Sequence, residues 1–355
     1  MTKVVVGMSG GVDSAVAALL LKNEGYQVVG LFMRNWHEKD DNGVCTAEND
    51  YADMVRVCAI LDIPYYSVDF SKEYYERVFA HFVDEYRKGR TPNPDVLCNR
   101  EIKFGPFLEH AQRLGADYIA TGHYAGISRV GGRTYLMRAK DDNKDQTYFL
   151  NQLTEKQIEN VLFPLENIVK DEVRTIAKEN GIPVAMKKDS TGVCFIGERD
   201  FRKFLSGYIP MREGDIVCDG QVVGKHNGVY YYTLGQRRGL GIGGDTEGDR
   251  WFVTGKDVEK NILYVSKGED QCLYHSRLTT DGFNFINGKP ENDEFDCLVR
   301  IRHRQPLQKA RANLVGDNVE LLFESPQRAI AAGQYAVLYD GMRVLGGGVI
   351  DKSSE

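Results

Sequence analysis

The chain has 355 residues, of which 42% are hydrophobic and 27% are charged, as in globular proteins. This length exceeds that of one average domain, so we expect two or three domains. The net charge of −6 argues against non-specific binding of nucleic acid but leaves room for a local basic patch.

Membrane, secretion and metal signals are absent from the sequence. No apolar stretch approaches the roughly 20 residues of a membrane span, and the first strand begins so early that we expect no signal peptide. The seven cysteines are scattered, odd in number and without a Cys-x-x-Cys pair. We therefore expect reduced thiols in the cytoplasm, no membrane partner, and neither a zinc site nor a disulfide framework.

The first stretch, residues 3–14, predicts a phosphate-binding loop. Val4–Met8 is an apolar run typical of a buried parallel strand, a Ser-Gly-Gly turn follows, and Ala15–Lys22 has a helical pattern that Gly25 ends. A helix start offers unpaired N–H groups and the positive end of the helix dipole, and glycines let an anion approach the backbone. The carboxylate of Asp13 is placed to hold a magnesium ion against the phosphates.

Two nucleotide-binding motifs are excluded at this loop. The Walker loop requires a lysine after its last glycine, which is absent, and so is the Gly-x-Gly-x-x-Gly dinucleotide fingerprint. The six residues Ser-Gly-Gly-Val-Asp-Ser, at 9–14, instead resemble the PP-loop of ATP pyrophosphatases. That resemblance implies cleavage of ATP to AMP and pyrophosphate with adenylation of a substrate oxygen. The alternative is an ordinary turn between a strand and a helix.

Strand-like and helix-like segments alternate over about the first 200 residues, which predicts an α/β fold with a parallel sheet. Right-handed crossovers place the carboxyl ends of the strands, and any ligand, at one edge of that sheet. We expect Ser71 to cap a helix that Gly89 ends, and Gly115 to end a later helix. Further strands are predicted at 27–33, 64–70 and 117–121, and helices at 48–61, 72–88 and 98–114.

A proline-rich segment precedes one candidate nucleophile. Residues 91–95, Thr-Pro-Asn-Pro-Asp, predict a stiff loop that cannot be helical, because each proline also makes its predecessor extended. Cys98 follows near the start of a predicted helix, a position that lowers a thiol pKa and yields a nucleophilic thiolate. Asp95 lies within reach as a general base. The alternative, which these residues alone favour, is a capping Asp95 and a Cys98 buried in the core.

A second candidate nucleophile is Cys194, which lies in the polar, glycine-bounded stretch 187–197 and not on an apolar helical face. Such cysteines are often exposed and reactive, although packing in the core is an equal alternative here. Two such thiols in one ATP-binding domain suggest that Cys98 and Cys194 meet across the site. The remaining cysteines are interpreted as structural: Cys45, Cys58, Cys218, Cys272 and Cys297.

The fourth predicted strand runs into Ala-Thr-Gly-His-Tyr, residues 120–124, at the same sheet edge as the PP-loop. Gly122 would allow a nucleotide to approach closely, and His123 could contact substrate. Met33, at the end of the second strand, is placed to pack on an adenine ring. The alternatives are a structural histidine and ordinary core packing of the methionine.

After about Arg199, short alternating strands replace the helical periodicity. Asp219-Gly220 and Asn227-Gly228 are turn signals, and Asp340-Gly341 predicts a hairpin. The barrel strands are predicted at 296–303, 311–315, 318–324, 335–339 and 343–350. The predicted domains are a catalytic domain at 1–200, a small β-rich domain at 201–274 and a C-terminal β-barrel at 275–355.

Six motifs, taken together and in order, resemble the bacterial tRNA-specific 2-thiouridylases of the PP-loop superfamily over nearly the whole chain. The motifs are Ser-Gly-Gly-Val-Asp-Ser (9–14), Asn-Pro-Asp-x-x-Cys-Asn (93–99), Ala-Thr-Gly-His-Tyr (120–124), Lys-Asp-Gln (144–146), Asp-Ser-Thr-Gly-x-Cys-Phe-Ile-Gly (189–197) and the glycine-rich run 232–244. The resemblance implies adenylation of the C2 oxygen of uridine 34 in tRNAs for Lys, Glu and Gln, followed by its replacement with sulfur.

The resemblance also assigns roles residue by residue. It implies that Cys194 carries a persulfide, that Cys98 is the partner nucleophile and that Asp95 is the acid or base. The implied ATP contacts are Gly7, Met8, Ser9, Gly10, Gly11, Val12, Asp13, Ser14, Met33 and Gly122. The implied tRNA contacts are Asn93, Pro94, Asp95, His123, Lys144, Asp145, Gln146, Arg302, His303 and Gln334.

The sequence also predicts phosphate contacts and a protein that donates sulfur. The cluster 300–304 and Lys187-Lys188 are expected to contact phosphates despite the acidic total. His303 departs from the family, in which a tyrosine is expected, but an imidazole can still stack on a base or pair with phosphate. The implied sulfur donor is a cysteine desulfurase or a sulfur-relay protein.

Two other functions remain as alternatives. A PP-loop amide synthase would leave Cys98 and Cys194 without a role. A non-catalytic RNA-binding protein would have no use for an intact PP-loop with Asp13, Asp95 and both thiols.

Overall fold

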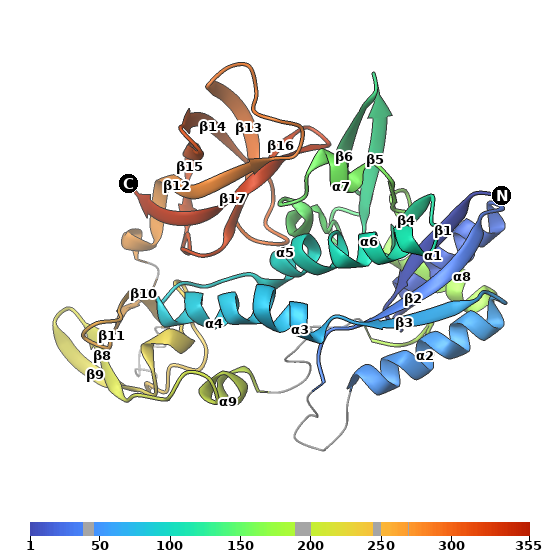
Figure 1. The fold of residues 1–355 in the computed structure, drawn as a ribbon. Coiled ribbons are helices and arrows are strands. Elements are labelled where there is room, and N and C mark those ends of the chain that lie inside the picture. The colour runs from blue at the N-terminus through green and yellow to red at the C-terminus, as the bar shows by residue number, and fades with distance from the viewer. Residues whose placement is uncertain (38–45, 189–199, 244–249, 269) are drawn as a thin grey trace.

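The computed structural model describes residues 1–37, 46–188, 200–243, 250–268 and 270–355. It contains a five-stranded parallel sheet, a four-stranded sheet and a barrel-forming sheet (Figure 1). The parallel sheet has the order β3-β2-β1-β4-β7, which confirms the predicted α/β architecture. Its strands are β1 (Lys3–Met8), β2 (Gln27–Arg34), β3 (Tyr65–Asp69), β4 (Tyr118–Thr121) and β7 (Val161–Leu162).

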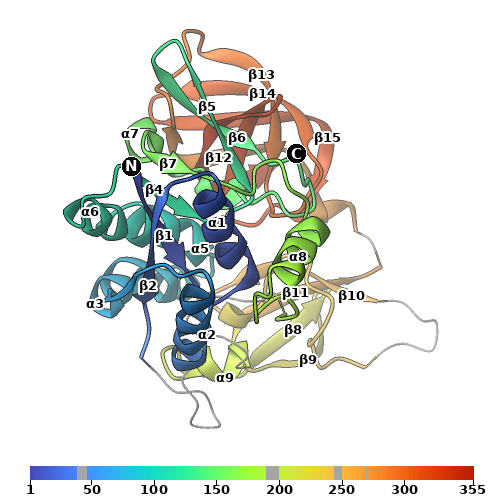
Figure 2. The same ribbon diagram turned by 90° about the vertical axis from the view of Figure 1, so that its right-hand side faces the viewer.

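Both faces of the parallel sheet are covered, as its continuous apolar strands require. Successive residues of β1 point to opposite faces, so Val4 and Val6 belong to one core and Val5 to another. The first core packs against α1 (Val12–Asn23), α2 (Thr46–Ile60) and α8 (Lys170–Glu179), which lie together on one face of the sheet (Figure 2). The second core includes residues of the helices that precede and follow the proline-rich loop.

The helix after β3 begins at Ser71, one residue earlier than predicted. It consists of α3 (Ser71–Tyr74), a π-helical turn (Tyr75–Phe79) and α4 (Ala80–Arg87). The expectation that Ser71 caps this helix is wrong, because Ser71 is its first residue. Asp69 Oδ1 accepts hydrogen bonds from the Ser71 backbone N–H at 2.9 Å and from its hydroxyl at 2.6 Å.

The helix predicted at 98–114 is wrong in its start and in its continuity. Helix α5 (Pro94–Cys98) continues as a π-helical turn (Asn99–Lys103), and α6 (Pro106–Arg113) is a separate helix. Proline is tolerated at a first helical position, where no intrahelical N–H bond is needed. The stiff loop therefore ends at Asn93, and Cys98 is the last residue of a short helix.

The central part begins with a helix that the strand pattern concealed, α9 (Phe201–Ser206). Its four-stranded sheet has the order β10-β11-β8-β9. The positive φ angles of Asp219 and Gly220, +48° and +78°, form the predicted turn between β8 and β9. The strands are β8 (Gly214–Cys218), β9 (Gln221–His226), β10 (Trp251–Asp257) and β11 (Ile262–Lys267).

The C-terminal strands form a six-stranded barrel that the pairing of β12 with β17 closes. Asp340-Gly341 forms the predicted hairpin between β16 and β17. The barrel strands are β12 (Tyr274–Phe285), β13 (Glu294–Arg300), β14 (Gln308–Val315), β15 (Asn318–Arg328), β16 (Tyr335–Asp340) and β17 (Arg343–Ser354).

A hairpin from the first 200 residues, which was not predicted, joins this barrel sheet. Strands β5 (Ala125–Val130) and β6 (Arg133–Arg138) pair with each other, and β6 pairs with β17 at Met137 and Arg343. Among the described residues, no helix is long and apolar enough to cross a membrane.

The connection from α4 to α5 runs beneath the barrel (Figure 1) and is held by both β-rich parts. The Thr91 N–H donates to the Ala332 carbonyl at 2.8 Å, and Gln334 Nε2 donates to the Thr91 carbonyl at 2.8 Å. The Thr91 hydroxyl lies 3.4 Å from that of Thr233 in the central part. Arg90 forms an ion pair with Glu85 on α4 at 2.9 Å. We call these contacts the interdomain clamp.

Gly333 is predicted to be essential for the clamp. It has φ +91°, and a Cβ there would lie 2.9 Å from the Thr91 nitrogen, whereas Gly341 (φ +56°) has nothing within 4 Å. Gly341→Ala should cost about 1–2 kcal/mol of unfolding free energy, and Gly333→Ala about 2–4 kcal/mol because crowding adds to backbone strain. Thermal midpoints of the two variants provide the measurement. Equal midpoints would show that the clamp is not tightly packed.

Candidate active site

The PP-loop is folded around its own hydroxyl groups. The Ser9 N–H donates to Ser14 Oγ at 3.2 Å, and the Ser14 hydroxyl donates to the Gly11 carbonyl at 3.1 Å. Helix α1 begins at Val12, three residues earlier than predicted, and its N-cap residue Gly11 provides no side-chain cap. The first-turn N–H groups of α1 are therefore available to an anion such as a phosphate.

Glycines are required where this loop touches its neighbours. A Cβ on Gly10, which has φ +74°, would lie 2.3 Å from the Asp50 carbonyl oxygen. A Cβ on Gly122 would lie 2.6 Å from the Ser14 nitrogen, so Gly122 brings the end of β4 directly against the start of α1. Met33 follows Phe32, which pairs with Met8, and so lies at the same sheet edge. Gly7 has no side chain, and the apolar side chains of Met8 and Val12 are buried. These three residues can therefore bind a polar ligand only through their backbone.

Asp13 contacts a lysine that sequence reasoning missed. Lys170 Nζ lies 2.7 and 2.8 Å from the two carboxylate oxygens of Asp13, and the Tyr124 hydroxyl donates to one of them at 3.0 Å. Among the described residues, no cluster of three His, Cys, Asp or Glu side chains is placed to hold a metal ion. The Asp13 carboxylate, which was expected to hold a magnesium ion, is paired with Lys170 in this structure.

Lys187 also has protein partners where phosphate contacts were expected. Its Nζ lies 2.7 Å from Asp50 and 2.6 Å from Asp53 on α2, and donates to the Gly10 carbonyl at 3.1 Å. Burial lowers the pKa of Lys187, but the hydrogen bonds to both carboxylates raise it overall. Lys187 thus anchors its segment to the PP-loop. Cys194 lies outside the described residues.

Cys98 is enclosed in the core, with 1% of its surface exposed, as the structural alternative predicted. Asp95 is not the cap of α5, because that position belongs to Asn93. Burial raises the pKa of Asp95, against the opposing effect of the Lys103 ammonium. Within the described chain, the buried amide oxygens of Asn93 and Asn99 have no hydrogen-bond partner. Asn93 precedes α5 and Asn99 follows it, so an unpartnered amide oxygen lies at each end of this short helix.

His123 links this helix to the sheet edge. Its Nδ1 lies 2.7 Å from the Thr121 hydroxyl, and its ring lies 6.2 Å from those of Phe104 and Phe163. Burial, and secondarily the Lys103 charge, lowers the pKa of His123 well below its usual value. His123 is therefore neutral near pH 7. Because Lys103 acts on both Asp95 and His123, these two groups lie within the electrostatic reach of one ammonium.

The predicted RNA segment 144–146 is only partly exposed. Asp145 is 1% exposed, and its carboxylate accepts from Arg300 at 2.7 Å and Arg138 at 3.2 Å. Arg300 is itself 4% exposed, so its expected phosphate contact is wrong. Gln146 is partly exposed and accepts from the Tyr124 N–H through Oε1 at 3.0 Å. This placement favours a structural role for Asp145 over a direct contact with RNA.

The turn that follows β13 in the barrel contributes Arg302 and His303 to the same region. The His303 ring packs 4.5 Å from that of Phe149, whose carbonyl accepts from Asn99 Nδ2 at 3.0 Å. Burial, with Arg304 nearby, lowers the pKa of His303 to about 4. A neutral imidazole cannot form an ion pair with phosphate, but it can still stack on a base or donate one hydrogen bond. Arg302 is partly buried and donates to the Ala329 carbonyl.

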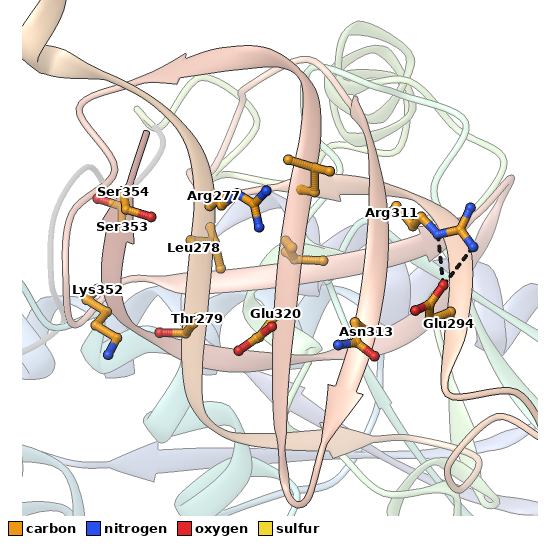
Figure 3. A pocket seen from close by; sticks show the side chains of 12 residues that line it. Arg277, Leu278, Thr279, Glu294, Arg311, Asn313, Glu320, Lys352, Ser353 and Ser354 are labelled. Atoms are coloured by element: carbon orange, nitrogen blue, oxygen red, sulfur yellow. Dashed lines mark hydrogen bonds and ion pairs between the residues drawn. The ribbon is translucent and has the colours of Figure 1, made fainter.

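A cavity on the outer face of the barrel contains none of the predicted site residues (Figure 3). Its volume is about 580 Å³. Arg311 and Glu294 form an ion pair of 2.7 Å at one end of it. Residues of β12, β14, β15 and β17 supply most of its lining, and the mixed charges give it no single preference for a ligand.

Three family models match consecutive parts of the chain. They are the tRNA methyl transferase HUP domain at residues 2–198, the tRNA methyl transferase PRC-barrel domain at 202–267 and the aminomethyltransferase beta-barrel domain at 275–350.

The chain is similar to curated proteins over nearly its whole length. The tRNA-specific 2-thiouridylase MnmA of Bacillus subtilis (strain 168) is 54% identical over 354 residues, covering 99% of this chain and 95% of that protein. MnmA of Halalkalibacterium halodurans is 56% identical over 353 residues, with the same coverage. Among solved structures, a 4-thiouridine synthetase–RNA complex with bound ATP is 18% identical, covers 59% of this chain and 50% of that chain, and has a TM-score of 0.35.

Gly10→Ala is predicted to weaken ATP binding by about tenfold or more, because the added Cβ displaces the loop or α2. Gly25→Ala is the matched control, since Gly25 has φ +87° but nothing within 4 Å. Equilibrium binding of ATP to both variants tests the prediction. Equal affinities would mean that the contact of Gly10 with α2 does not shape the loop.

The low pKa of His303 predicts a pH dependence of stability. Between about pH 6.5 and pH 4, His303 binds a proton in the unfolded chain but not in the folded chain. This histidine therefore lowers the free energy of unfolding as the pH falls. In His303→Phe this loss is absent, and the thermal midpoint should fall less between pH 7 and pH 4.5 than in the unaltered protein. Parallel curves would contradict the assignment.

Proposed function

This chain belongs to the tRNA-specific 2-thiouridylases, and we propose that it uses ATP to replace the C2 oxygen of uridine 34 in tRNA with sulfur. The observation that carries the proposal is the 54–56% identity to curated 2-thiouridylases over 99% of the chain. The PP-loop geometry supports it, because the N-cap residue Gly11 gives the start of α1 no side-chain cap and leaves its first-turn N–H groups to an anion.

The chemistry requires activation first. The C2 carbonyl of uracil is a poor electrophile with oxide as leaving group, so adenylation converts its oxygen into an AMP ester and releases pyrophosphate. We assign the ATP contacts to Gly7–Ser14, Met33 and Gly122. The Gly122 contact with the start of α1 supports this, since it makes one continuous surface from β1 to β4.

Sulfur transfer then needs two thiols. The terminal sulfur of a persulfide on Cys194 attacks C2, and AMP leaves with the oxygen. The Cys98 thiolate attacks the sulfur of Cys194, which forms a Cys98–Cys194 disulfide and leaves sulfur on the base. The burial of Cys98 implies that α5 and its π-helical turn shift before this exchange.

The target base is assigned to Asn93–Asp95. The unpartnered amide oxygen of Asn93 is suited to accept the N3–H of uracil, and burial, which raises the pKa of Asp95, suits its carboxyl to act as an acid or base. A flipped uridine 34 would reach this pocket from the anticodon loop.

We assign the tRNA contacts to His123, Lys144, Gln146, Arg302 and His303, with Asp145 and Gln334 holding this surface from within. Gln334 is engaged with the Thr91 and Pro92 carbonyls, which supports this division. Residues 1–200 perform the chemistry, and 201–274 and 275–355 bind tRNA. The tRNAs are those for Lys, Glu and Gln, the sulfur donor is a cysteine desulfurase or relay protein, and the reaction takes place in the cytoplasm.

Magnesium, if bound, is held by the ATP phosphates, because Asp13 is paired with Lys170. An amide synthase is the less favoured alternative, since it leaves the two motif cysteines without a role.

Cys98→Ala and Cys194→Ala are predicted to abolish thiolation but to retain tRNA-dependent release of pyrophosphate, because adenylation precedes the thiol steps. Cys272→Ala is the control, since Cys272 is exposed and lies outside every motif. Mass spectrometry of tRNA after incubation with ATP and a persulfide donor should show oxygen-for-sulfur exchange at uridine 34 only with the control and the unaltered protein. Thiolation by Cys194→Ala would refute the persulfide assignment.

A further inference from the structure

The PP-loop carboxylate is held by a buried cation. Lys170 is 7% exposed and Tyr124 is 2% exposed, and both bind Asp13. Lys170 contacts both carboxylate oxygens, and its Nζ also lies 5.8 Å from the centre of the Tyr124 ring. A buried ammonium is costly unless it is paired, so this geometry fixes Lys170 and Asp13 as a unit.

The backbone of Lys170 is fixed by a second carboxylate. Lys170 is the first residue of α8, and the N-cap residue Val169 provides no side-chain cap. The Lys170 N–H instead donates to Asp141 Oδ2 at 3.0 Å. Asp141 Oδ1 accepts from the N–H groups of Asn143 at 3.1 Å and Lys144 at 3.2 Å. Lys170 thus contacts the PP-loop through its side chain and the turn 141–144 through its backbone.

That turn leads directly to groups assigned to tRNA binding. Asp145, which follows it, is paired with Arg300 of the barrel, and Gln146 exchanges hydrogen bonds with the Tyr124 backbone at 2.9 and 3.0 Å. Tyr124 in turn contacts Asp13. Two routes of contact therefore run from the PP-loop to segment 144–146, one through Lys170 and Asp141 and one through Tyr124.

We propose that Lys170 is a positioning residue for adenylation, whose ammonium sets Asp13 in the PP-loop and whose attachment to Asp141 sets the loop against the tRNA-contacting segment. This inference rests on the proposed function. Asp13 orients the loop through Lys170, and the loop N–H groups bind the phosphates. Removing the ammonium leaves an uncompensated carboxylate where the polyphosphate of ATP must bind, and like charges repel there.

The test compares Lys170→Met, which keeps the side-chain length, with Lys170→Arg, which keeps the charge. Lys178→Met is the control, because Lys178 is exposed on the same helix. ATP binding without tRNA, tRNA binding by filter retention and the KM for ATP are measured. Lys170→Met should raise the Kd and KM for ATP by about tenfold or more, and Lys170→Arg should recover most of this loss.

A folded variant is recognised by its tRNA affinity, which should stay within about threefold of the unaltered protein. An unchanged ATP affinity in Lys170→Met, or equal losses of ATP and tRNA binding, would overturn the proposal. The double variant Asp13→Asn/Lys170→Met should bind ATP no worse than the weaker single variant if the two residues act as a unit. Additive losses would refute that unit.

Failure of the inference and failure of the proposed function are distinguishable. ATP binding without tRNA requires no thiolation, so it tests Lys170 even if the unaltered protein leaves uridine 34 unchanged. An unaltered protein that binds ATP but does not thiolate tRNA would refute the function alone.

Discussion

The interdomain clamp is the constraint on which the arrangement of this molecule depends. Thr91 is fixed by the hydrogen bond that it donates to the Ala332 carbonyl and by the one that it accepts from Gln334, and Asp95 and Cys98 follow within seven residues. The distance between a candidate nucleophile and the PP-loop is thus set by the barrel as well as by the parallel sheet. Because the clamp joins all three parts of the chain, a change in the barrel can alter chemistry that it does not touch.

Electrostatics divides the candidate site into distinct regions. At the PP-loop, Asp13 and Lys170 neutralise each other, and Lys187 is shared between two carboxylates. Around α5, burial keeps His123 and His303 neutral and raises the pKa of Asp95. Positive charge for a polyanion must therefore come from helix N–H groups and exposed cations, and the interior around α5 is suited to an uncharged base.

The sequence predicted local features well and distant pairings poorly. The apolar run Val4–Met8 and the glycines after it carry the first strand and the PP-loop, since their conformation depends on a few neighbours. The break at Gly105-Pro106 was overlooked because the helical periodicity continues across it. No local signal pairs Asp145 with Arg300 or Asp13 with Lys170, because more than 150 residues separate the members of each pair. Asp145 and Arg300 were predicted to contact RNA, but both are buried and pair with each other instead.

The hairpin of β5 and β6 has a consequence for the order in which the chain is made. In the part of the chain that the structure describes, its outer edge pairs with β17, whose residues follow about 200 positions later. At ribosomal speeds of about 5–20 residues per second, this edge waits roughly 10–40 s for its partner. An open strand edge is a template for wrong pairing, so this interval is when the nascent protein is most exposed to aggregation. The short length of β5 and β6, six residues each, limits that exposure.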